Sequence, residues 1–310
     1  MKYTFRKPLT GLDIDGISLK MVQVIKEKKV WRLVRYKELP LPPETLELSH
    51  KDENIMDPRL FLDTVNQALQ YMSGRVNSVG LSLPNESVKV TTHQFKGLHE
   101  SETKIRQLIA WKEKTTLPFP VEKAKISCFP FSPKSMEERL YLIGIGSEDI
   151  IRDYEMNLRH LKINPKVIRP AVINHLNFYV RSIKSLGIIA FLGLFEQYFT
   201  FFVFEDLQLI FYRGKRKSSS YFHFLQEIDM TVELFQREFP DKKIERLYVG
   251  SQTEMSQDME KDIRGNSDLD FILLDENKII SMDQGELGSE EGIHIRPYIS
   301  AIGAAKSLAD

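Results

Sequence analysis

The chain has 310 residues, of which 42% are hydrophobic and 28% are charged. This composition excludes an intrinsically disordered chain, and the length favours two domains or two lobes separated by a cleft. The 43 lysines and arginines balance the 43 aspartates and glutamates, so no net charge favours nucleic acid or an anionic membrane surface as a partner. The basic run 213–217 is interpreted as a solvated turn after a strand. We therefore expect no nucleic-acid partner.

Cysteine and histidine positions exclude two further classes of protein. Cys128 is the single cysteine, and no cluster of histidine and cysteine has metal-ligand spacing, so neither a disulfide scaffold nor a zinc site is expected. The N-terminal residues lack the apolar core of a secretion signal, and no apolar run in the sequence reaches the roughly 18 residues that cross a bilayer. These features predict a cytoplasmic protein whose contact with a membrane is indirect, through a partner.

The N-terminal segment predicts a meander of three antiparallel strands, followed by a helix and a fourth strand. β-rich runs separated by turn or charged residues place the three strands at 11–13, 18–25 and 30–39. Consecutive prolines then end the meander, because proline has no N–H for a ladder hydrogen bond. Asp57 and Pro58 begin the helix, with Asp57 as the capping acceptor. Residues 76–83 form the fourth strand.

The same order of elements recurs roughly 175 residues later. An apolar strand, a polar break and a second strand occupy 187–204, a third strand follows at 208–213, a helix at 220–238 and a further strand at 244–250. The aromatic residues of the second strand are interpreted as core: Tyr198, Phe199, Phe201, Phe202 and Phe204. A duplicated unit of this kind predicts an α/β protein with the actin-like fold, in which two ribonuclease-H-like halves face each other.

The segment between the two halves predicts a small inserted α/β subdomain. It has helical spacing at 102–115, strands at 125–131 and 138–146, and a further helix that begins after Ser147, the expected capping acceptor. The predicted division of the chain is therefore a first half at 1–84, the inserted subdomain at 85–165, a helix returning to the first half at 166–186, the second half at 187–295, and a C-terminal helix closing on the cleft at 296–310.

The turn between the first two strands is the strongest candidate for a ligand site. It contains Asp13, Asp15, Gly16 and Ser18, and Lys20 lies in the strand that follows. Glycine can adopt backbone angles closed to other residues and so leaves amide donors free for phosphate oxygens, while a carboxylate at a strand end can hold a metal-bound water. If the turn is a retained nucleotide site, these five residues are the predicted contacts to the phosphates and their cation. The alternative is an ordinary hairpin turn with Lys20 in solvent.

Four segments, taken together, have the order and spacing of a known family. They are Gly11-Leu12-Asp13-Ile14, Ala110-Trp111-Lys112-Glu113 leading to Leu117-Pro118-Phe119-Pro120, Val167-Ile168-Arg169-Pro170-Ala171, and Arg296-Pro297-Tyr298-Ile299-Ser300-Ala301-Ile302-Gly303-Ala304-Ala305. On these segments, which span nearly the whole chain, the sequence resembles the PilM family, the actin-like cytoplasmic proteins of type IV pilus assembly. The cytoplasmic actin-like part of the type II secretion L protein is a close alternative.

This resemblance implies a scaffold of the inner-membrane platform that assembles type IV pili. Such a protein would bind the short cytoplasmic tail of a PilN-type bitopic membrane protein, in a groove between the inserted subdomain and the first half. It would also contact other platform or motor proteins. Its place would be the cytoplasmic side of a Gram-negative inner membrane, with membrane contact only through its partners.

The sequence departs from the family's nucleotide-binding pattern in both phosphate loops. Where the first loop of the family has Asp-Ile-Gly, this chain has Asp15 at the glycine position, and two like charges about 4 Å apart repel by roughly 4 kcal/mol at an effective dielectric near 20. In the second loop, Gly193 stands at the metal-binding carboxylate and Phe195 at the loop glycine. In the adenosine-binding part, Gly250 and Gly303 are the glycines that would still let a base and ribose approach.

These departures predict a degenerate nucleotide site and a protein that is not an enzyme and needs no cofactor. No side chain is positioned as a base to activate water, and ordinary structural roles are expected for His93, His99, His160, His175, His223 and His294. Two other hypotheses stay open. One is an ATP- and magnesium-dependent switch or weak ATPase of the same fold, in which Asp15 coordinates a cation; the other is an adaptor for type II secretion.

Overall fold

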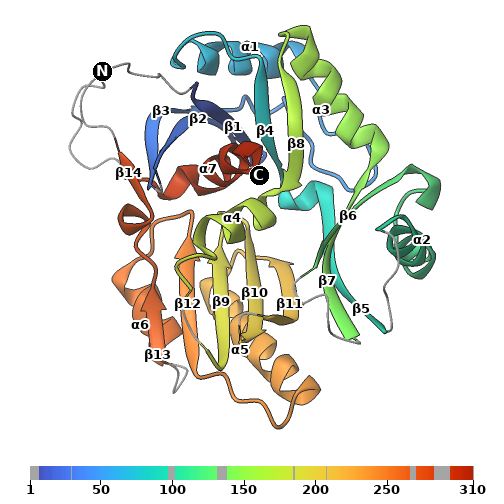
Figure 1. Ribbon diagram of the computed structural model, residues 1–310, viewed down its shortest axis with the longest axis vertical. Coiled ribbons are helices and arrows are strands. Elements are labelled where there is room, and N and C mark those ends of the chain that lie inside the picture. Colours follow the sequence, from blue (N-terminus) through green and yellow to red (C-terminus); the bar gives the residue numbers. More distant parts are fainter. Residues whose placement is uncertain are drawn as a thin grey trace.

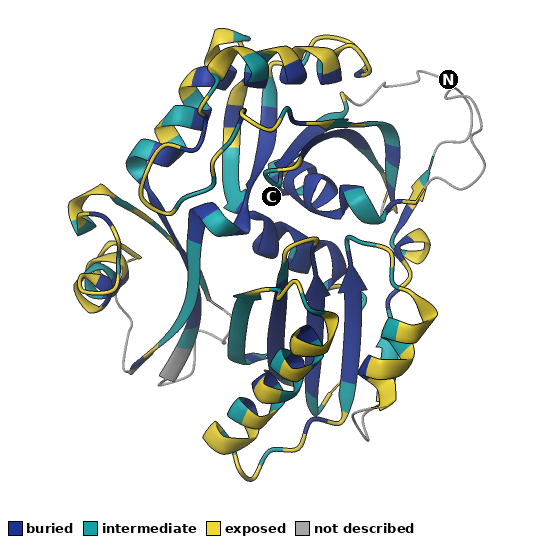
Figure 2. Cartoon of the chain, turned by 180° about the vertical axis from the view of Figure 1, so that it is seen from behind, coloured by how far each residue is buried: buried dark blue, intermediate teal, exposed yellow. Residues whose placement is uncertain are grey.

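The computed structural model describes residues 7–28, 30–96, 102–130, 138–183, 186–206, 208–265, 270–282 and 294–309. Two sheets lie one above the other, with helices α4 (Ala171–Tyr179) and α7 (Ile299–Lys306) between them, and a third, smaller sheet lies to one side (Figure 1). Nearly every residue of α4 and α7 is buried (Figure 2). None of the described helices combines the length and the apolar character that crossing a bilayer requires.

The first sheet contains the predicted meander. β1 (Leu9–Ile14), β2 (Ser18–Glu27) and β3 (Val30–Pro40) are antiparallel, while β4 (Ser78–Leu83) and β8 (Asn164–Pro170) continue the sheet parallel to β1. Their order is β3-β2-β1-β4-β8. Burial follows the apolar pattern, since five of the six residues of both β1 and β4 are buried.

Two helices cover the outer face of the first sheet (Figure 1). α1 (Pro58–Leu69) begins as predicted, because the Asp57 side chain accepts hydrogen bonds from the backbone N–H groups of Arg59 and Leu60. α3 (Glu148–His160) begins after Ser147, but the predicted side-chain cap is wrong. The Ser147 hydroxyl is buried and has no hydrogen-bond partner among the described residues. Glu148 and Asp149 in the first turn instead complement the N-terminal end of the helix dipole.

The second sheet repeats the strand order of the first. β9 (Ile188–Leu194), β10 (Tyr198–Glu205) and β11 (Gln208–Arg216) form the meander, and β12 (Arg246–Ser251) and β13 (Asp270–Leu273) complete the order β11-β10-β9-β12-β13. The outer face is covered by α5 (Tyr221–Glu238) and α6 (Gln257–Gly265) (Figure 1). The predicted core role of the phenylalanines in β10 is confirmed, since all four are buried.

Two features of the second half differ from the sequence analysis. Residues 213–217 are not a solvated turn: β11 continues to Arg216, and Arg213 and Lys215 both pair with Glu227 of α5. The strand β14 (Ile280–Met282), which the sequence placed within 187–295, adds to the edge of the first sheet beside β3. Ile280 is buried in the cluster that contains Trp31 of β3. Burial of this apolar side chain therefore favours the pairing of β14 with the first sheet.

The third sheet forms the predicted α/β insertion. Its order is β5 (Val88–Lys96), β7 (Glu138–Ser147), β6 (Ala124–Pro130), all antiparallel, and α2 (Glu102–Glu113) packs on it through buried Ile105 and Ile109. This sheet has its own apolar cluster, separate from those of the two larger sheets. α3 follows β7 directly and returns the chain to the first sheet.

An acidic side chain is buried where α2 meets this third sheet. Glu113 is 4% exposed; its carboxylate accepts from Lys89 Nζ at 2.7 Å and lies 2.5 Å from His93 Nε2. The Thr116 hydroxyl is a further donor. Burial by itself would raise the pKa of Glu113, but the hydrogen bonds from Lys89, Thr116 and His93 lower it to about 2. Glu113 therefore stabilises the fold as a carboxylate.

Glu113→Gln is expected to lower the free energy of unfolding by about 2 kcal/mol at pH 7. The neutral amide removes the negative charge that pairs with the Lys89 ammonium group. A carboxyl group with a depressed pKa in the folded state stabilises above its unfolded pKa and loses that contribution as the pH falls. The difference from wild type should therefore shrink between pH 5 and pH 2, measured by urea unfolding. Glu122→Gln, at an exposed position, should change little at any pH.

Glycines allow α7 to lie against the first sheet. Gly11 of β1 and Gly80 of β4 are register partners in the parallel pair. A Cβ at Gly80 would stand 2.6 Å from the Ala304 carbonyl carbon, and one at Gly11 would stand 2.8 Å from the Ala305 backbone nitrogen. Both positions therefore require glycine, because any side chain there would overlap the backbone of α7.

Candidate functional site

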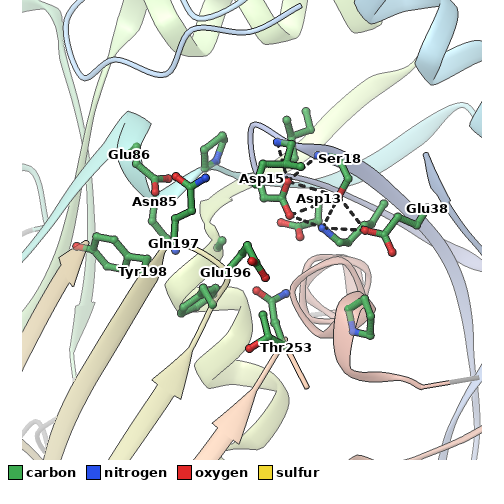
Figure 3. A pocket seen from close by; sticks show the side chains of 18 of the residues that line it. Asp13, Asp15, Ser18, Glu38, Asn85, Glu86, Glu196, Gln197, Tyr198 and Thr253 are labelled. Atoms are coloured by element: carbon green, nitrogen blue, oxygen red, sulfur yellow. Dashed lines mark hydrogen bonds and ion pairs between the residues drawn. The ribbon is translucent and has the colours of Figure 1, made fainter. Parts of the chain in front are cut away.

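A cleft lies between the two large sheets at the ends of their meander turns. It has a volume of about 510 Å³, and its walls include the β1–β2 turn, residues 84–86 after β4, the β9–β10 turn and residues 252–254 after β12. A second cavity of about 500 Å³ shares Asp15 and Tyr198 with it and extends to His50 and Arg216. Figure 3 shows Asp13, Asp15 and Glu38 on one wall, with Glu86 and Glu196 on the other side.

The β1–β2 turn is closed by one of its own carboxylates. Gly16 has a φ of 86°, so the turn uses the backbone conformation that favours glycine. Asp15 Oδ1 accepts hydrogen bonds from the backbone N–H of Ile17 at 3.0 Å and of Ser18 at 2.8 Å. These two amides are the donors that the turn would offer to a phosphate oxygen, and the Asp15 carboxylate already occupies them.

Lys20 neutralises this carboxylate from the adjacent strand. The residue is 6% exposed; its ammonium group pairs with Asp15, donates to the Ser18 hydroxyl at 2.7 Å and lies 3.6 Å from Glu38. Burial alone would lower the pKa of Lys20, but Asp15 and Asp13 raise it above its usual range. Burial opposes ionisation of Asp15 too, yet Lys20 and the turn amides hold its pKa below the usual value. The lysine is bound internally in its charged form.

Asp13 differs from Asp15, because it is buried without comparable partners. It is 2% exposed and lines the cleft, and its Oδ1 atom has no hydrogen-bond partner among the described residues. Burial raises the pKa of Asp13 to about 6, although Lys20 acts in the opposite direction. This oxygen is closed to solvent, and Ser82 of β4, the register partner of Asp13, acts against the effect of burial by lowering the pKa of Asp13.

The β9–β10 turn presents an aromatic ring to the cleft. Phe195 lines the cleft, is 5% exposed and packs on the ring of His175 with centroids 4.6 Å apart. Its backbone N–H donates to the Tyr198 carbonyl at 2.9 Å, so the hairpin itself uses this amide. His175 is fully buried among aromatic rings, and burial lowers its pKa to about 3. It is a neutral core residue.

The two glycines predicted to admit a base and ribose do not line this cleft. A Cβ at Gly250 would lie 2.5 Å from the ring of Tyr179, and one at Gly303 would lie 2.7 Å from the Asn174 carbonyl carbon. Gly250 therefore makes room for a buried tyrosine of α4, and Gly303 lets α7 cross α4 closely. Their small size serves packing inside the protein.

Other histidines have ordinary surroundings. His93 contacts Glu113, His160 and His223 are exposed, and His294 lies 3.5 Å from Glu254. His99 lies outside the described residues. Within the described ranges, no three histidine, cysteine, aspartate or glutamate side chains converge in a way that could hold a metal ion.

The charge of the cleft is strongly acidic. Lys20 is the only basic side chain among its described lining residues, against six carboxylates: Asp13, Asp15, Glu38, Glu86, Glu196 and Glu254. Burial raises the pKa of Glu86 above its usual range. A polyphosphate in this cleft would face carboxylates on several sides, while the lysine charge is already compensated.

The structure thus brings together part of the predicted site. Asp13, Asp15, Ser18 and Lys20 line the main cleft, and Gly16 lines the adjoining cavity. Sequence reasoning missed Glu38 and Glu86. Glu38 could have been found, because the meander makes it the register partner of Lys20 across β2 and β3. Glu86 comes from a short helical turn after β4, and no local pattern directs it to the cleft.

Comparison with solved structures identifies the fold. A chain in the PilM–PilN type IV pilus biogenesis complex matches with a TM-score of 0.82, covering 98% of this chain and 99% of that one at 15% identity. A Bacteroides thetaiotaomicron protein of unknown function with an actin-like ATPase fold matches with a TM-score of 0.54, over 91% and 95% of the two chains at 8% identity. The chain has an actin-like fold. The predicted fold class is confirmed.

A third structural match bears on the alternative family. The cytoplasmic domain of EpsL, an inner-membrane component of the type II secretion system of Vibrio cholerae, matches with a TM-score of 0.50 over 98% and 96% of the two chains at 8% identity. No protein-family profile matches the sequence, and no curated protein matches it significantly. The resemblance to PilM that the four segments indicated is confirmed in three dimensions, at the level of the fold.

Proposed function

We propose that this protein is a PilM-like scaffold of the type IV pilus inner-membrane platform, which acts by binding partners and is not an enzyme. The observation that carries the proposal is the fold match to a chain of the PilM–PilN type IV pilus biogenesis complex over 98% of this chain. On this proposal the protein lies at the cytoplasmic side of the inner membrane. Its partner there is the cytoplasmic tail of a PilN-type bitopic protein.

Several contacts in the cleft support a degenerate nucleotide site. Asp15 occupies the turn amides, Lys20 is bound internally, and Phe195 fills the second turn. Tyr179 takes the space beside Gly250. These residues do not fit a magnesium nucleotide, so we propose a scaffold that needs no cofactor. The alternative of a nucleotide switch is favoured by one observation, the Asp13 carboxylate that lines the cleft near the end of β1.

The junction of the first and third sheets supports an extended tail as the ligand. β8 and β6 are end strands of their sheets within the described residues. The two edges lie near each other, because the guanidinium of Arg169 on β8 stands 5.8 Å from the ring centroid of Phe129 on β6. An extended peptide gains main-chain hydrogen bonds by adding to such an edge, and neighbouring side chains give specificity. We propose this junction as the tail-binding groove.

A peptide with the sequence of the cytoplasmic tail of the PilN-type protein from the same organism tests the proposal. Fluorescence anisotropy should give micromolar affinity for the full chain, unchanged by ATP with magnesium. Arg169→Glu should weaken binding about tenfold, because it alters the charge at the groove. Arg181→Glu, at an exposed position after α4, should not.

The outcomes separate the alternatives. Tail binding that requires ATP, or micromolar binding of magnesium ATP by calorimetry, would favour the switch hypothesis over the scaffold. Absence of tail binding under all conditions would contradict the scaffold function. Preferential binding of a type II secretion partner's tail over the PilN-type tail would favour the adaptor for that system.

A further inference from the structure

The inserted segment carries a positive charge that the balanced total conceals. Residues 88–147, which include the whole third sheet and α2, contain ten lysines and arginines against six glutamates, so their net charge is +4. Because the complete chain is balanced, the remaining residues have a net charge of −4. A charge asymmetry of this kind is typical of proteins that present one side to an anionic surface. An anionic partner is therefore attracted to the third sheet and its helix.

α2 forms the outermost layer of this inserted segment. Alternate residues of β7 point to opposite faces of the third sheet. Leu142 is buried in the central cluster that contains residues of α4, whereas Ile143 and Ile145 are buried in the cluster that contains Ile105 and Ile109 of α2. Figure 1 shows α2 on the side of the third sheet that faces away from the two large sheets. The side of α2 opposite its buried residues therefore faces solvent.

Five exposed residues lie on that side of α2. This outer face of α2 consists of Thr103, Lys104, Gln107, Trp111 and Lys114. Trp111 is 76% exposed and has no ring or cation contact with another described residue. The two glutamates of α2 lie elsewhere, since Glu113 is buried and Glu102 pairs with Arg106. The charged groups of the outer face are thus both lysines, one on each side of an exposed indole.

This combination suits a phospholipid surface. Tryptophan is enriched at the membrane–water interface, because its ring is apolar while its N–H can bond to headgroups or water. A lysine near an anionic bilayer is attracted to it, and the long stem of lysine lets the ammonium group stay among the headgroups. Single-stranded nucleic acid is bound differently, in a groove where several aromatic rings stack on successive bases. The outer face of α2 is an exposed helix surface with one aromatic ring, which favours lipid.

We propose that the outer face of α2 binds directly to an anionic phospholipid bilayer, with the Trp111 ring at the interface and Lys104 and Lys114 beside lipid phosphates. This contact goes beyond the scaffold function, in which the protein meets the membrane through its partners. The proposed tail groove borders β6, which belongs to the sheet that α2 covers. A tail that leaves the bilayer and the outer face of α2 can therefore approach one membrane surface. The lipid contact itself does not rest on tail binding.

Vesicles of phosphatidylcholine, with and without phosphatidylglycerol, test the proposal on the full chain in the absence of any partner. Co-sedimentation measures partition onto the vesicles. The chain has two tryptophans, and Trp31 is 7% exposed, so Trp31→Phe leaves Trp111 as the single fluorescent reporter. With anionic vesicles we expect Trp111 emission to shift to the blue and its quenching by acrylamide to fall. Raising the salt concentration should weaken partition.

Two sets of variants locate the contact. Lys104→Glu with Lys114→Glu should lower partition at least tenfold, because both attractive charges become repulsive. Trp111→Ala should lower it about fivefold, because the interfacial ring is lost. The matched control is Lys243→Glu with Lys261→Glu, which reverses two exposed lysines of the second half and should leave partition unchanged. Circular dichroism spectra and Tm values equal to those of wild type show that the variants fold.

The results divide as follows between lipid and other partners. Binding to anionic vesicles that the α2 double variant loses, together with the blue shift, supports the proposal. It is overturned by no partition, by equal partition onto neutral vesicles, by an unshifted Trp111 emission, or by a loss no larger than that of the control. Binding of a single-stranded oligonucleotide without binding of vesicles overturns it as well. The vesicle assay contains no PilN-type peptide, so its failure and the failure of the scaffold function are distinguishable.

Discussion

Asp15→Asn is expected to lower the free energy of unfolding by about 3 kcal/mol at pH 7. The amide keeps an oxygen for the N–H groups of Ile17 and Ser18, so the turn geometry survives. It removes the negative charge that pairs with Lys20, a lysine that is 6% exposed and cannot turn to solvent without rearrangement. Breaking a buried pair by neutralising one partner costs more than the pair contributes, because the other charge stays buried.

Guanidinium unfolding followed by tryptophan fluorescence measures this loss, with Asp241→Asn as the exposed control. The pKa of Asp15 is lowered in the folded state. Its stabilising contribution is therefore present above the ordinary aspartate pKa and is lost as the pH falls through the folded value. The stabilities of wild type and Asp15→Asn should therefore begin to converge as the pH falls below about 4, the ordinary aspartate pKa. A variant as stable as wild type at pH 7 would show that Glu38 and Asp13 suffice to hold Lys20.

Gly80→Ala is expected to destabilise the protein by about 3–5 kcal/mol, as the second large effect. The new Cβ would stand 2.6 Å from the Ala304 carbonyl carbon, which is backbone and cannot rotate away as a side chain would. α7 cannot move outward freely, because it is buried between the first sheet and α4. The substitution therefore strains the contact that joins the two halves of the fold.

Gly265→Ala is the matched control for this substitution. A Cβ at Gly265 would meet nothing within 4 Å, and alanine has the higher helix propensity at the end of α6. Thermal unfolding should show a loss of several degrees in Tm for Gly80→Ala and no loss for Gly265→Ala. Equal Tm values for Gly80→Ala and wild type would mean that α7 is not held closely against β4.

Both turns of the cleft are held by contacts within the protein. In the first turn, a carboxylate of the chain satisfies the amides, and a lysine of the chain neutralises that carboxylate. In the second turn, Phe195 and His175 pack into an apolar contact. The positions that a ligand would organise are thus held by contacts within the protein.

Much of the fold could be predicted from local sequence. The meanders followed from β-rich runs separated by turns, the start of α1 from Asp57 and Pro58, and the duplication from the repeated order of elements. These features depend on hydrogen bonding and burial within one or two neighbouring elements. Local residue patterns therefore suffice to predict them. The first-turn residues Asp13, Asp15, Ser18 and Lys20 were found for the same reason, since they are adjacent in one hairpin.

The other features of the fold and the cleft depend on contacts between segments far apart in the sequence. The roles of Gly250 and Gly303 depend on Tyr179 and Asn174, which pack against them from a helix more than 70 residues earlier. β14 joins the first sheet because Ile280 is buried there beside Trp31, not because of any local signal. Glu86 and Glu196 share one cleft only because two distant turns meet. The sequence by itself determined the elements and the hairpin chemistry, while close packing determined which side chains face the cleft.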